Sequence, residues 1–166
     1  MNKFIGGVAI AASLFLCPIS SSAAGYSEVG EYGRPFVYIT EDTEEQIQDE
    51  IYLGELELLA QLVHAEAGNQ PMEGKYLVAE VVLNRVESPD FPDSISEVIF
   101  QEGQFSVAHN GRLEKAAWTV DQSDFEAVTY AVETHDNKQV LYFNNCSIVA
   151  GKGEKFKVGG HWFRNG

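Results

Sequence analysis

The amino-acid sequence predicts an α+β domain in which helices come first and a small β-sheet lies near the C-terminus. Apolar residues recur at helical spacing from Leu53 to Ala67, and a second, strongly apolar helical pattern follows Pro71. Runs typical of strands come later, at residues 140–143 and 156–163. The chain has 166 residues, 45% hydrophobic and 22% charged, which is the balance expected of one globular domain.

The first two helices are expected to form the core. The first should end near Ala67, because Gly68 interrupts its apolar pattern. The second should begin at Pro71, a residue suited to the first helical position. Its run of valine, leucine and alanine predicts a helix at the centre of the fold.

Two more helices and a pair of strands should complete the domain. A short helix is expected over residues 94–100 and a third long helix over about 123–134. Ser123 followed by Glu126 has the spacing of a capping box at the start of that long helix. The two strand-like runs are expected to be joined by a loop that contains glycine and lysine.

The N-terminal region has the pattern of an export signal. Lys3 precedes an uncharged apolar run at 4–16 and small residues follow, which predicts a secretory signal peptide over residues 1–24. The run is shorter than the roughly 20 residues of a membrane-spanning helix. We therefore expect a secreted or periplasmic protein with no stable membrane insertion after cleavage. Residues 25–52 are interpreted as an acidic N-terminal arm and residues 53–166 as the compact domain.

Charge and cysteine content exclude several functions. The net charge is −14, which would repel nucleic acid and anionic lipid headgroups, so neither is an expected partner. A polymeric substrate would have to be held by a groove. Cys146 is the one cysteine beyond the expected signal peptide, so no internal disulfide is predicted. A monomer is expected.

Glu66 is the first candidate for chemistry. It lies at the edge of the apolar stripe of the first helix, next to the helix end. A carboxyl group held against apolar side chains has a raised pKa and can serve as the general acid of glycosidic cleavage. Periodicity alone favours another interpretation, a solvated glutamate at a helix end.

Several short motifs along the chain favour the interpretation of Glu66 as a catalytic acid. They are HAEAGNQPMEGK at 64–75, VVLNRV at 81–86, FPDSI at 91–95, VIF at 98–100, QFS at 104–106, LYF at 141–143 and GGHWF at 159–163. In number, order and spacing these motifs resemble the SleB/CwlJ family of cell-wall hydrolases, named for spore cortex-lytic enzymes, over about residues 56–164. Residues 68–70 depart from the pattern, since Gly-Asn-Gln replaces the usual Arg-Gly-Glu, and Lys75 stands where glutamine is common.

The resemblance implies a lysozyme-like domain of the lytic transglycosylase type. Such an enzyme acts on peptidoglycan glycan strands between N-acetylmuramic acid and N-acetylglucosamine, and the family's catalytic glutamate falls on Glu66. This group would first protonate the leaving oxygen. It would then, as a base, help the muramyl C6 hydroxyl close a 1,6-anhydro ring. The resemblance implies no metal and no cofactor.

Five other residues are candidates for binding the glycan. The resemblance places Gln104 and Ser106 in the groove, although the same pattern fits polar neighbours of a buried Phe105. Tyr142 and His161 could offer hydrogen bonds or a flat face to a sugar, with a core position equally open for Tyr142. Glu73 is the fifth candidate. Its place in the first turn of a helix also suits a purely structural role.

Other functions remain open at this stage. A hydrolase, either a muramidase or a glucosaminidase, could use Glu73 to activate water, and a non-catalytic wall-binding module could share the fold. A zinc amidase built on His64, His109 and His161 is disfavoured, because their separations match no short metal motif. Cys146 as a nucleophile is disfavoured in the same way, with a small residue near a strand end as the simpler interpretation.

Overall fold

The computed structural model describes residues 43–137, 139–146 and 151–166. The expected signal peptide and the first part of the expected arm lie outside the described residues. The chain forms two units, residues 1–47 and 48–166, and the second unit holds the fold described below. Within the described ranges, no helix combines the length and apolar character needed to span a membrane.

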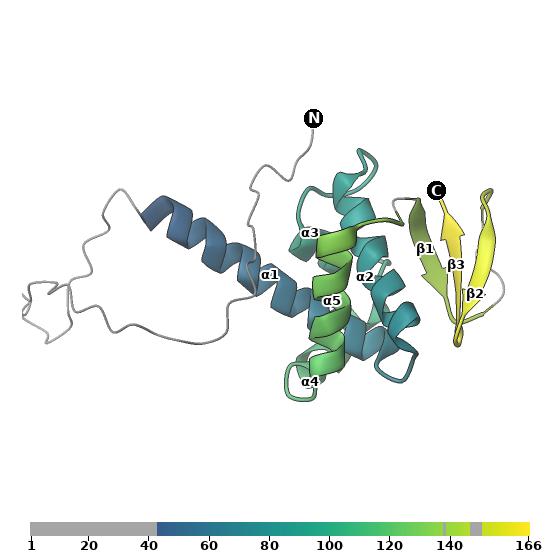
Figure 1. Ribbon diagram of the computed structural model, residues 1–166, viewed down its shortest axis with the longest axis horizontal. Coiled ribbons are helices and arrows are strands. Elements are labelled where there is room, and N and C mark those ends of the chain that lie inside the picture. The colour runs from purple at the N-terminus through teal and green to yellow at the C-terminus, as the bar shows by residue number, and fades with distance from the viewer. Residues whose placement is uncertain (1–42, 138, 147–150) are drawn as a thin grey trace, which may run out of the picture. The chain divides into compact units, whose positions relative to one another are not determined.

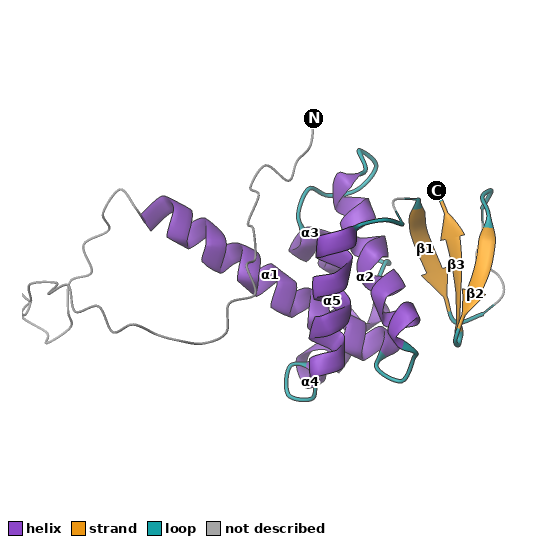
Figure 2. Ribbon diagram, in the orientation of Figure 1, coloured by secondary structure: helices purple, strands orange, loops and turns teal. Residues whose placement is uncertain are grey.

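Helices precede a small sheet, which confirms the predicted α+β class (Figures 1 and 2). The elements are α1 (Thr43–Ala67), α2 (Met72–Glu87), α3 (Ile95–Phe100), the 3-10 helix η1 (Ser106–Ala108), α4 (Arg112–Ala116), α5 (Gln122–Thr134), β1 (Val140–Asn144), β2 (Lys155–Val158) and β3 (His161–Asn165).

Helix α2 forms the centre of the fold, as its apolar sequence predicts. All residues from Gly74 to Val86 are buried, so the helix has no solvent-facing side over that length. It packs against α3, α5 and β1. The helix begins one residue later than predicted, because Pro71 has an extended backbone with ψ 159° and takes the N-cap position.

Helix α1 ends at Ala67, as predicted, but it begins at Thr43, well before the predicted start near Leu53. Ile51 and Leu53 are 54% and 63% exposed, whereas the fully buried stripe begins at Leu59. The early turns thus have no buried face. Apolar periodicity detects a helix by its buried face, so it does not predict these turns. The division of the chain at residue 53 stays a prediction.

Helix α5 ends at Thr134 as predicted, but its capping box lies two residues earlier than the sequence pattern indicates. The Asp121 side chain accepts hydrogen bonds from the backbone amides of Ser123 and Asp124 at 2.8 and 3.3 Å. The Asp124 carboxylate accepts one from the Asp121 amide at 3.0 Å. The predicted Ser123–Glu126 box is therefore wrong, because an aspartate two positions earlier caps the helix instead.

The three strands form an antiparallel sheet in the order β1-β3-β2. The run at 156–163, predicted as one strand, is a hairpin of β2 and β3 that turns at Gly159 and Gly160. Gly159 has φ +56°, and a Cβ atom there would lie 2.5 Å from Oε1 of Gln70. The amide of Gly160 donates a hydrogen bond to the same oxygen at 2.7 Å. The hairpin turn is thereby attached to the loop that follows α1.

Two polar side chains of α2 attach β1 to the helices. Nδ2 of Asn84 donates to the carbonyl oxygens of Asn137 and Val140, both at 2.8 Å. Nε of Arg85 donates to the carbonyl oxygen of Leu141 at 2.9 Å. Both side chains are buried, so these hydrogen bonds supply partners within the protein for Nδ2 of Asn84 and Nε of Arg85 in place of solvent.

His135 forms a charged contact at the C-terminal end of α5. Its Nδ1 lies 2.9 Å from Oε2 of the fully buried Glu80, and its Nε2 lies 3.3 Å from Oε2 of Glu87. The hydrogen bond with Glu80 is the main cause that raises the pKa of His135, against an opposing effect of burial. His135 also has the left-handed backbone that ends the helix, with φ 37°.

We expect this contact to make stability depend on pH. In the unfolded chain the imidazole titrates at about pH 6.5. The contact therefore stabilises the fold fully below that pH, and this stabilisation is lost as the pH rises through the raised pKa of folded His135. His135→Asn tolerates the left-handed backbone but does not titrate. Urea unfolding should show the variant destabilised by on the order of 1–2 kcal/mol near pH 6 and by less near pH 9. An equal loss at both pH values would contradict this assignment.

Candidate active site

Glu66 lies in the last turn of α1, between two buried alanines. Ala65 and Ala67 are 9% and 0% exposed, and the Glu66 side chain is half-buried between the core and the surface. Burial raises the pKa of Glu66, while the positive charge of Arg112 acts in the opposite direction. The carboxyl group can therefore hold a proton closer to neutral pH than an exposed glutamate can.

Glu66 opens into a cleft of about 550 Å³, a size suited to a small part of a ligand or polymer. Among the described residues that line it, Glu66 is the one carboxylic acid. The other lining residues come from the α1–α2 loop, from α2, from the segment around η1 and α4, and from the sheet. They are Asn69, Gln70, Arg85, Gly103, Gln104, Phe105, Ser106, His109, Arg112, Phe143, Asn144, Asn145, Gly160 and His161.

Three of the predicted glycan-binding residues line this cleft together with Glu66: Gln104, Ser106 and His161. Gln104 and Ser106 are exposed, so a ligand can reach them, whereas Phe105 between them is 2% exposed. The two interpretations of this motif are compatible, because the phenyl ring packs inward while its polar neighbours remain at the surface. Their roles in binding stay predictions.

The structure does not bring Glu73 or Tyr142 to the cleft lining. Glu73 is exposed in the first turn of α2, where a negative charge suits the helix dipole. The ring of Tyr142 lies against the guanidinium of Arg164, with 3.8 Å from Cζ to the ring centroid. Successive residues of a strand point to opposite faces, so Phe143 lines the cleft and Tyr142 packs elsewhere.

Two polar side chains of the cleft are buried, Arg85 and His161. Within the described part of the chain, Nη1 of Arg85 and Nδ1 of His161 have no hydrogen-bond partner. Burial lowers the pKa of Arg85 to about 10, which leaves it charged at neutral pH, with Cζ 5.0 and 5.1 Å from the ring centroids of Phe91 and Phe105. Burial also lowers the pKa of His161, which favours a neutral imidazole.

Arg112 is a cleft residue that sequence reasoning missed. It begins α4, which follows the left-handed turn at Gly111 with φ +79°. Its Nη2 donates a hydrogen bond to the carbonyl oxygen of Ala65 at 2.5 Å, next to Glu66 in the chain. A helix of five residues has no periodicity to detect, so no local signal in the sequence indicates that Arg112 reaches the end of α1.

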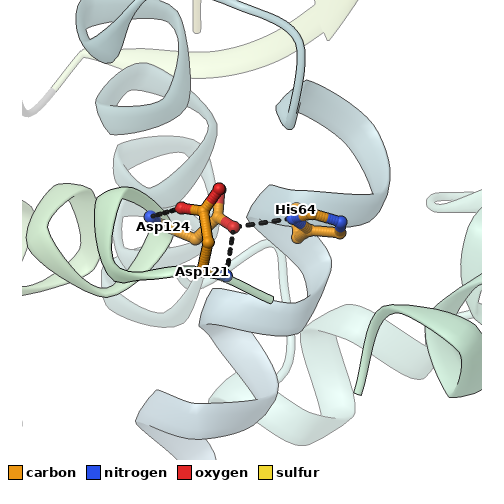
Figure 3. Close-up of side chains that lie close together, drawn as sticks. All are labelled: His64, Asp121 and Asp124. Atoms are coloured by element: carbon orange, nitrogen blue, oxygen red, sulfur yellow. Dashed lines mark hydrogen bonds and ion pairs between the residues drawn. The ribbon is translucent and has the colours of Figure 1, made fainter. Parts of the chain in front are cut away.

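A second polar cluster, made of His64, Asp121 and Asp124, lies outside the cleft lining (Figure 3). Nδ1 of His64 lies 2.7 Å from Oδ2 of the buried Asp124, and ligand atoms of His64, Asp121 and Asp124 lie within 4.8 Å of one another. Such a group could in principle bind a metal ion. However, Nζ of Lys75 lies 2.7 Å from Oδ1 of Asp124, where it supplies the positive charge. We interpret the cluster as a structural network that joins α1, α2 and α5.

The zinc hypothesis gains no support from this geometry. His109 and His161 line the cleft, whereas His64 belongs to the cluster with Asp124. The three histidines considered as ligands therefore lie in two separate environments. His64 is also two residues from Glu66 on the helix, so the two side chains occupy different faces.

Known proteins are similar to this chain in sequence. The spore cortex-lytic enzyme of Halalkalibacterium halodurans is 33% identical over 117 residues, which cover 67% of this chain and 34% of that protein. The spore cortex-lytic enzyme of Bacillus subtilis is 32% identical over 115 residues, which cover 66% of this chain and 37% of that protein. The chain thus spans about a third of the length of these curated relatives.

Two solved structures have the same fold. The catalytic domain of the germination-specific lytic transglycosylase SleB from Bacillus anthracis is 29% identical, with a TM-score of 0.57, and the match covers 67% of this chain and 93% of that chain. The catalytic domain of the Bacillus cereus SleB protein is 30% identical, also with a TM-score of 0.57, covering 67% of this chain and 89% of that chain. These matches confirm the fold that the sequence motifs implied.

A family model described as Cell Wall Hydrolase matches residues 69–164, which is more than half of the chain. The match begins after Glu66, so the role of that residue rests on the cleft geometry and on the motif around it. The family itself is shown by the matched residues and agrees with the relatives and the fold. The chain belongs to the Cell Wall Hydrolase family.

Proposed function

We propose that this chain cleaves the glycan strands of peptidoglycan between N-acetylmuramic acid and N-acetylglucosamine, as a lytic transglycosylase. The observation that carries the proposal is Glu66, a half-buried acid with a raised pKa that opens into a cleft. Membership of the Cell Wall Hydrolase family and the likeness to SleB catalytic domains support the same reaction class.

One carboxyl group can perform both halves of this reaction. Protonated Glu66 gives its proton to the glycosidic oxygen as the bond from that oxygen to the muramyl C1 breaks. This leaves an oxocarbenium-like centre and releases the glucosamine end as an alcohol. The Glu66 carboxylate then takes the proton from the muramyl C6 hydroxyl, while the C6 oxygen forms a bond to C1 and closes the 1,6-anhydro ring. Glu66 ends protonated, ready for another cycle.

Intramolecular attack is favoured over hydrolysis by the composition of the cleft. A hydrolase positions water with a second carboxylate, yet Glu73, the candidate for that role, is not among the cleft residues. The C6 hydroxyl is tethered to the reacting ring and can reach effective molarities on the order of 10⁵ M or more. Water at its bulk concentration would then compete poorly for C1.

The site of action would be the cell envelope. We propose export directed by residues 1–24, an arm over residues 25–52 and a catalytic domain over 53–166 that acts as a monomer on the wall. The apolar run at residues 4–16 and the acidic composition of the arm support this organisation. Repulsion by the net charge of −14 argues against nucleic acid and anionic membrane surfaces as partners.

Glu66→Gln should abolish glycan cleavage while the fold is kept, because the amide has the shape of the acid but no transferable proton. Loss of a general acid costs about 10²–10⁴ in rate. Turbidity clearing of purified peptidoglycan measures the rate, and circular dichroism measures the fold. Glu97→Gln, an exposed change on α3 outside the cleft, is the matched control. Near wild-type clearing by folded Glu66→Gln protein would reject Glu66 as the catalyst.

The muramyl product should end in a 1,6-anhydro ring. Mass spectrometry should find fragments lighter than hydrolytic ones by the mass of one water, and borohydride should not reduce them. Reducible muramic acid ends would assign the chain as a muramidase, and reducible glucosamine ends as a glucosaminidase. Either result would make Glu73 the next residue to test, and the absence of any released fragment would favour a wall-binding module.

Activity should survive thorough chelation. The proposed reaction needs no Lewis acid, and the ammonium group of Lys75 already neutralises the carboxylate of the His64–Asp124 cluster. Clearing rates before and after dialysis against a chelator provide the measurement. Loss of activity that zinc restores would support the amidase alternative, and a parallel loss of thermal stability would indicate a structural ion instead.

A further inference from the structure

We propose that Arg112 binds a carboxylate on the muramyl residue that Glu66 attacks, and thereby makes the cleft selective for muramyl residues that carry this charge. The inference rests on the proposed function and adds a determinant of substrate choice to it. The site would take a carboxylate carried through the lactyl ether at C3 of the sugar: either the free lactyl carboxylate of a residue without a peptide, or a carboxylate within the stem peptide, which is joined to the lactyl group by a neutral amide.

The position of Arg112 is suited to such a contact. Its hydrogen bond to the Ala65 carbonyl oxygen at 2.5 Å orients the guanidinium beside the turn that carries Glu66. This bond uses one N–H group, and most of the donors of the guanidinium remain available in the cleft. The side chain is exposed, so a ligand can reach it. A guanidinium presents parallel donors that match the two oxygens of a carboxylate.

The overall charge makes a local cation necessary. The chain has a net charge of −14, and a glycan strand rich in carboxylates would be repelled by that surface. The described lining of the cleft contains two cationic side chains, Arg85 and Arg112. Arg85 is 5% exposed, lies against aromatic rings and donates Nε to the backbone of β1. Arg112 is therefore the cation that meets a bound strand.

In the substrate, the charged substituent lies close to the reacting carbon, as Arg112 lies close to Glu66 in the protein. The lactyl ether lies on C3 of the same sugar ring whose C1 reacts with Glu66. A group fixed to the residue next to Glu66 therefore lies within about one sugar ring of that substituent. Neutral muramyl residues would lose the ion pair with Arg112 but would keep every contact with Gln104, Ser106 and His161 that they could otherwise make.

A cycle of enzyme variants and substrate charge tests the proposal. Glycan strands stripped of peptides by an amidase carry free lactyl carboxylates, and coupling to methylamine with a carbodiimide converts these to neutral amides. Wild-type kcat/KM should fall about tenfold on amidation, as expected for loss of one charged hydrogen-bonded contact. Arg112→Gln should itself not respond to amidation, and its loss relative to wild type should be about tenfold greater on charged strands than on amidated strands. A change in the pKa of Glu66 acts on both substrates alike, so it cancels in this comparison.

Lys115→Gln provides the matched control, because Lys115 is an exposed cation on the same short helix and does not line the cleft. It should respond to amidation as the wild type does, although its net charge equals that of Arg112→Gln. Arg112→Lys keeps the positive charge but loses the parallel N–H donors of the guanidinium, and it should keep part of the selectivity for charged strands. Thermal unfolding of each variant checks that the fold is kept.

The same measurements with peptide-bearing strands identify the source of the carboxylate. Selectivity on stripped strands assigns the lactyl group, whereas selectivity confined to peptide-bearing strands assigns the stem peptide. Carboxylate recognition would be overturned if Arg112→Gln were slower than wild type by the same factor on charged and on amidated strands of both kinds. It would also be overturned if the wild type were indifferent to amidation of both stripped and peptide-bearing strands.

Failure of the proposed function would be visible separately, because no wild-type fragments would appear from any strand. The inference would then be tested by calorimetry of Glu66→Gln protein with the two stripped strands. Tighter binding of the charged strand, lost in the Glu66→Gln, Arg112→Gln double variant, supports the role of Arg112. Equal binding of both strands overturns it.

Discussion

The fold depends on a helix that is buried on all sides and yet carries polar side chains. Helix α2 holds Lys75, Glu80, Asn84 and Arg85, each at most 5% exposed. A charged or amide group in such surroundings costs several kcal/mol unless it is paired, so each requires a partner at a defined place. Lys75 and Glu80 find theirs on α5 and at its C-cap, and the other two find theirs along β1. The elements around α2 are thereby fixed in register as well as in packing.

The same pairing extends to the active site. Asp124, which meets Lys75 of α2, also bonds His64 in the last turns of α1. Arg112 of α4 reaches the backbone of Ala65, and Gln70 holds the β2–β3 turn. Three separate polar contacts therefore tie the turn that carries Glu66, and the loop that follows it, to α5, to α4 and to the β2–β3 turn. Such attachment would keep Glu66, the proposed catalytic group, in place without reorganisation during the reaction.

How much the sequence predicts follows from the range of the interactions involved. The end of α1, the centre of the fold and the end of α5 are set by local signals, and these predictions are confirmed. The sequence pattern misplaces the capping box of α5, because Asp121 and Ser123 are both good capping residues. Asp121 takes the role because the Asp124 carboxylate, which accepts the Asp121 amide, is fixed by contacts with α1 and α2. The pattern also predicts one strand in place of the hairpin, because strand-forming residues continue on both sides of the glycines.

The residues of the candidate site also fall into two groups, those that a local motif predicts and those whose position depends on long-range contacts. Glu66 stands out because a motif surrounds it, and Gln104, Ser106 and His161 belong to motifs as well. Arg112 belongs to none, since its place depends on a short turn and on one long-range hydrogen bond. Tyr142 shows the opposite case. A motif singled it out, but strand alternation directs its ring to Arg164.

The electrostatics of Glu66 explain how one residue can give and then take a proton. Burial favours the protonated form that the first step needs and makes the carboxylate left behind a stronger base, while the nearby charge of Arg112 favours the carboxylate and makes the proton easier to give up. Gln70, which replaces the usual glutamate of this motif, lines the same cleft and uses its amide oxygen to accept the Gly160 N–H. A carboxylate at that position would add a negative charge and disfavour ionisation of Glu66. The neutral amide makes the structural contact without that effect, so burial and Arg112 remain the two opposing influences on the pKa of Glu66, the proposed catalytic group.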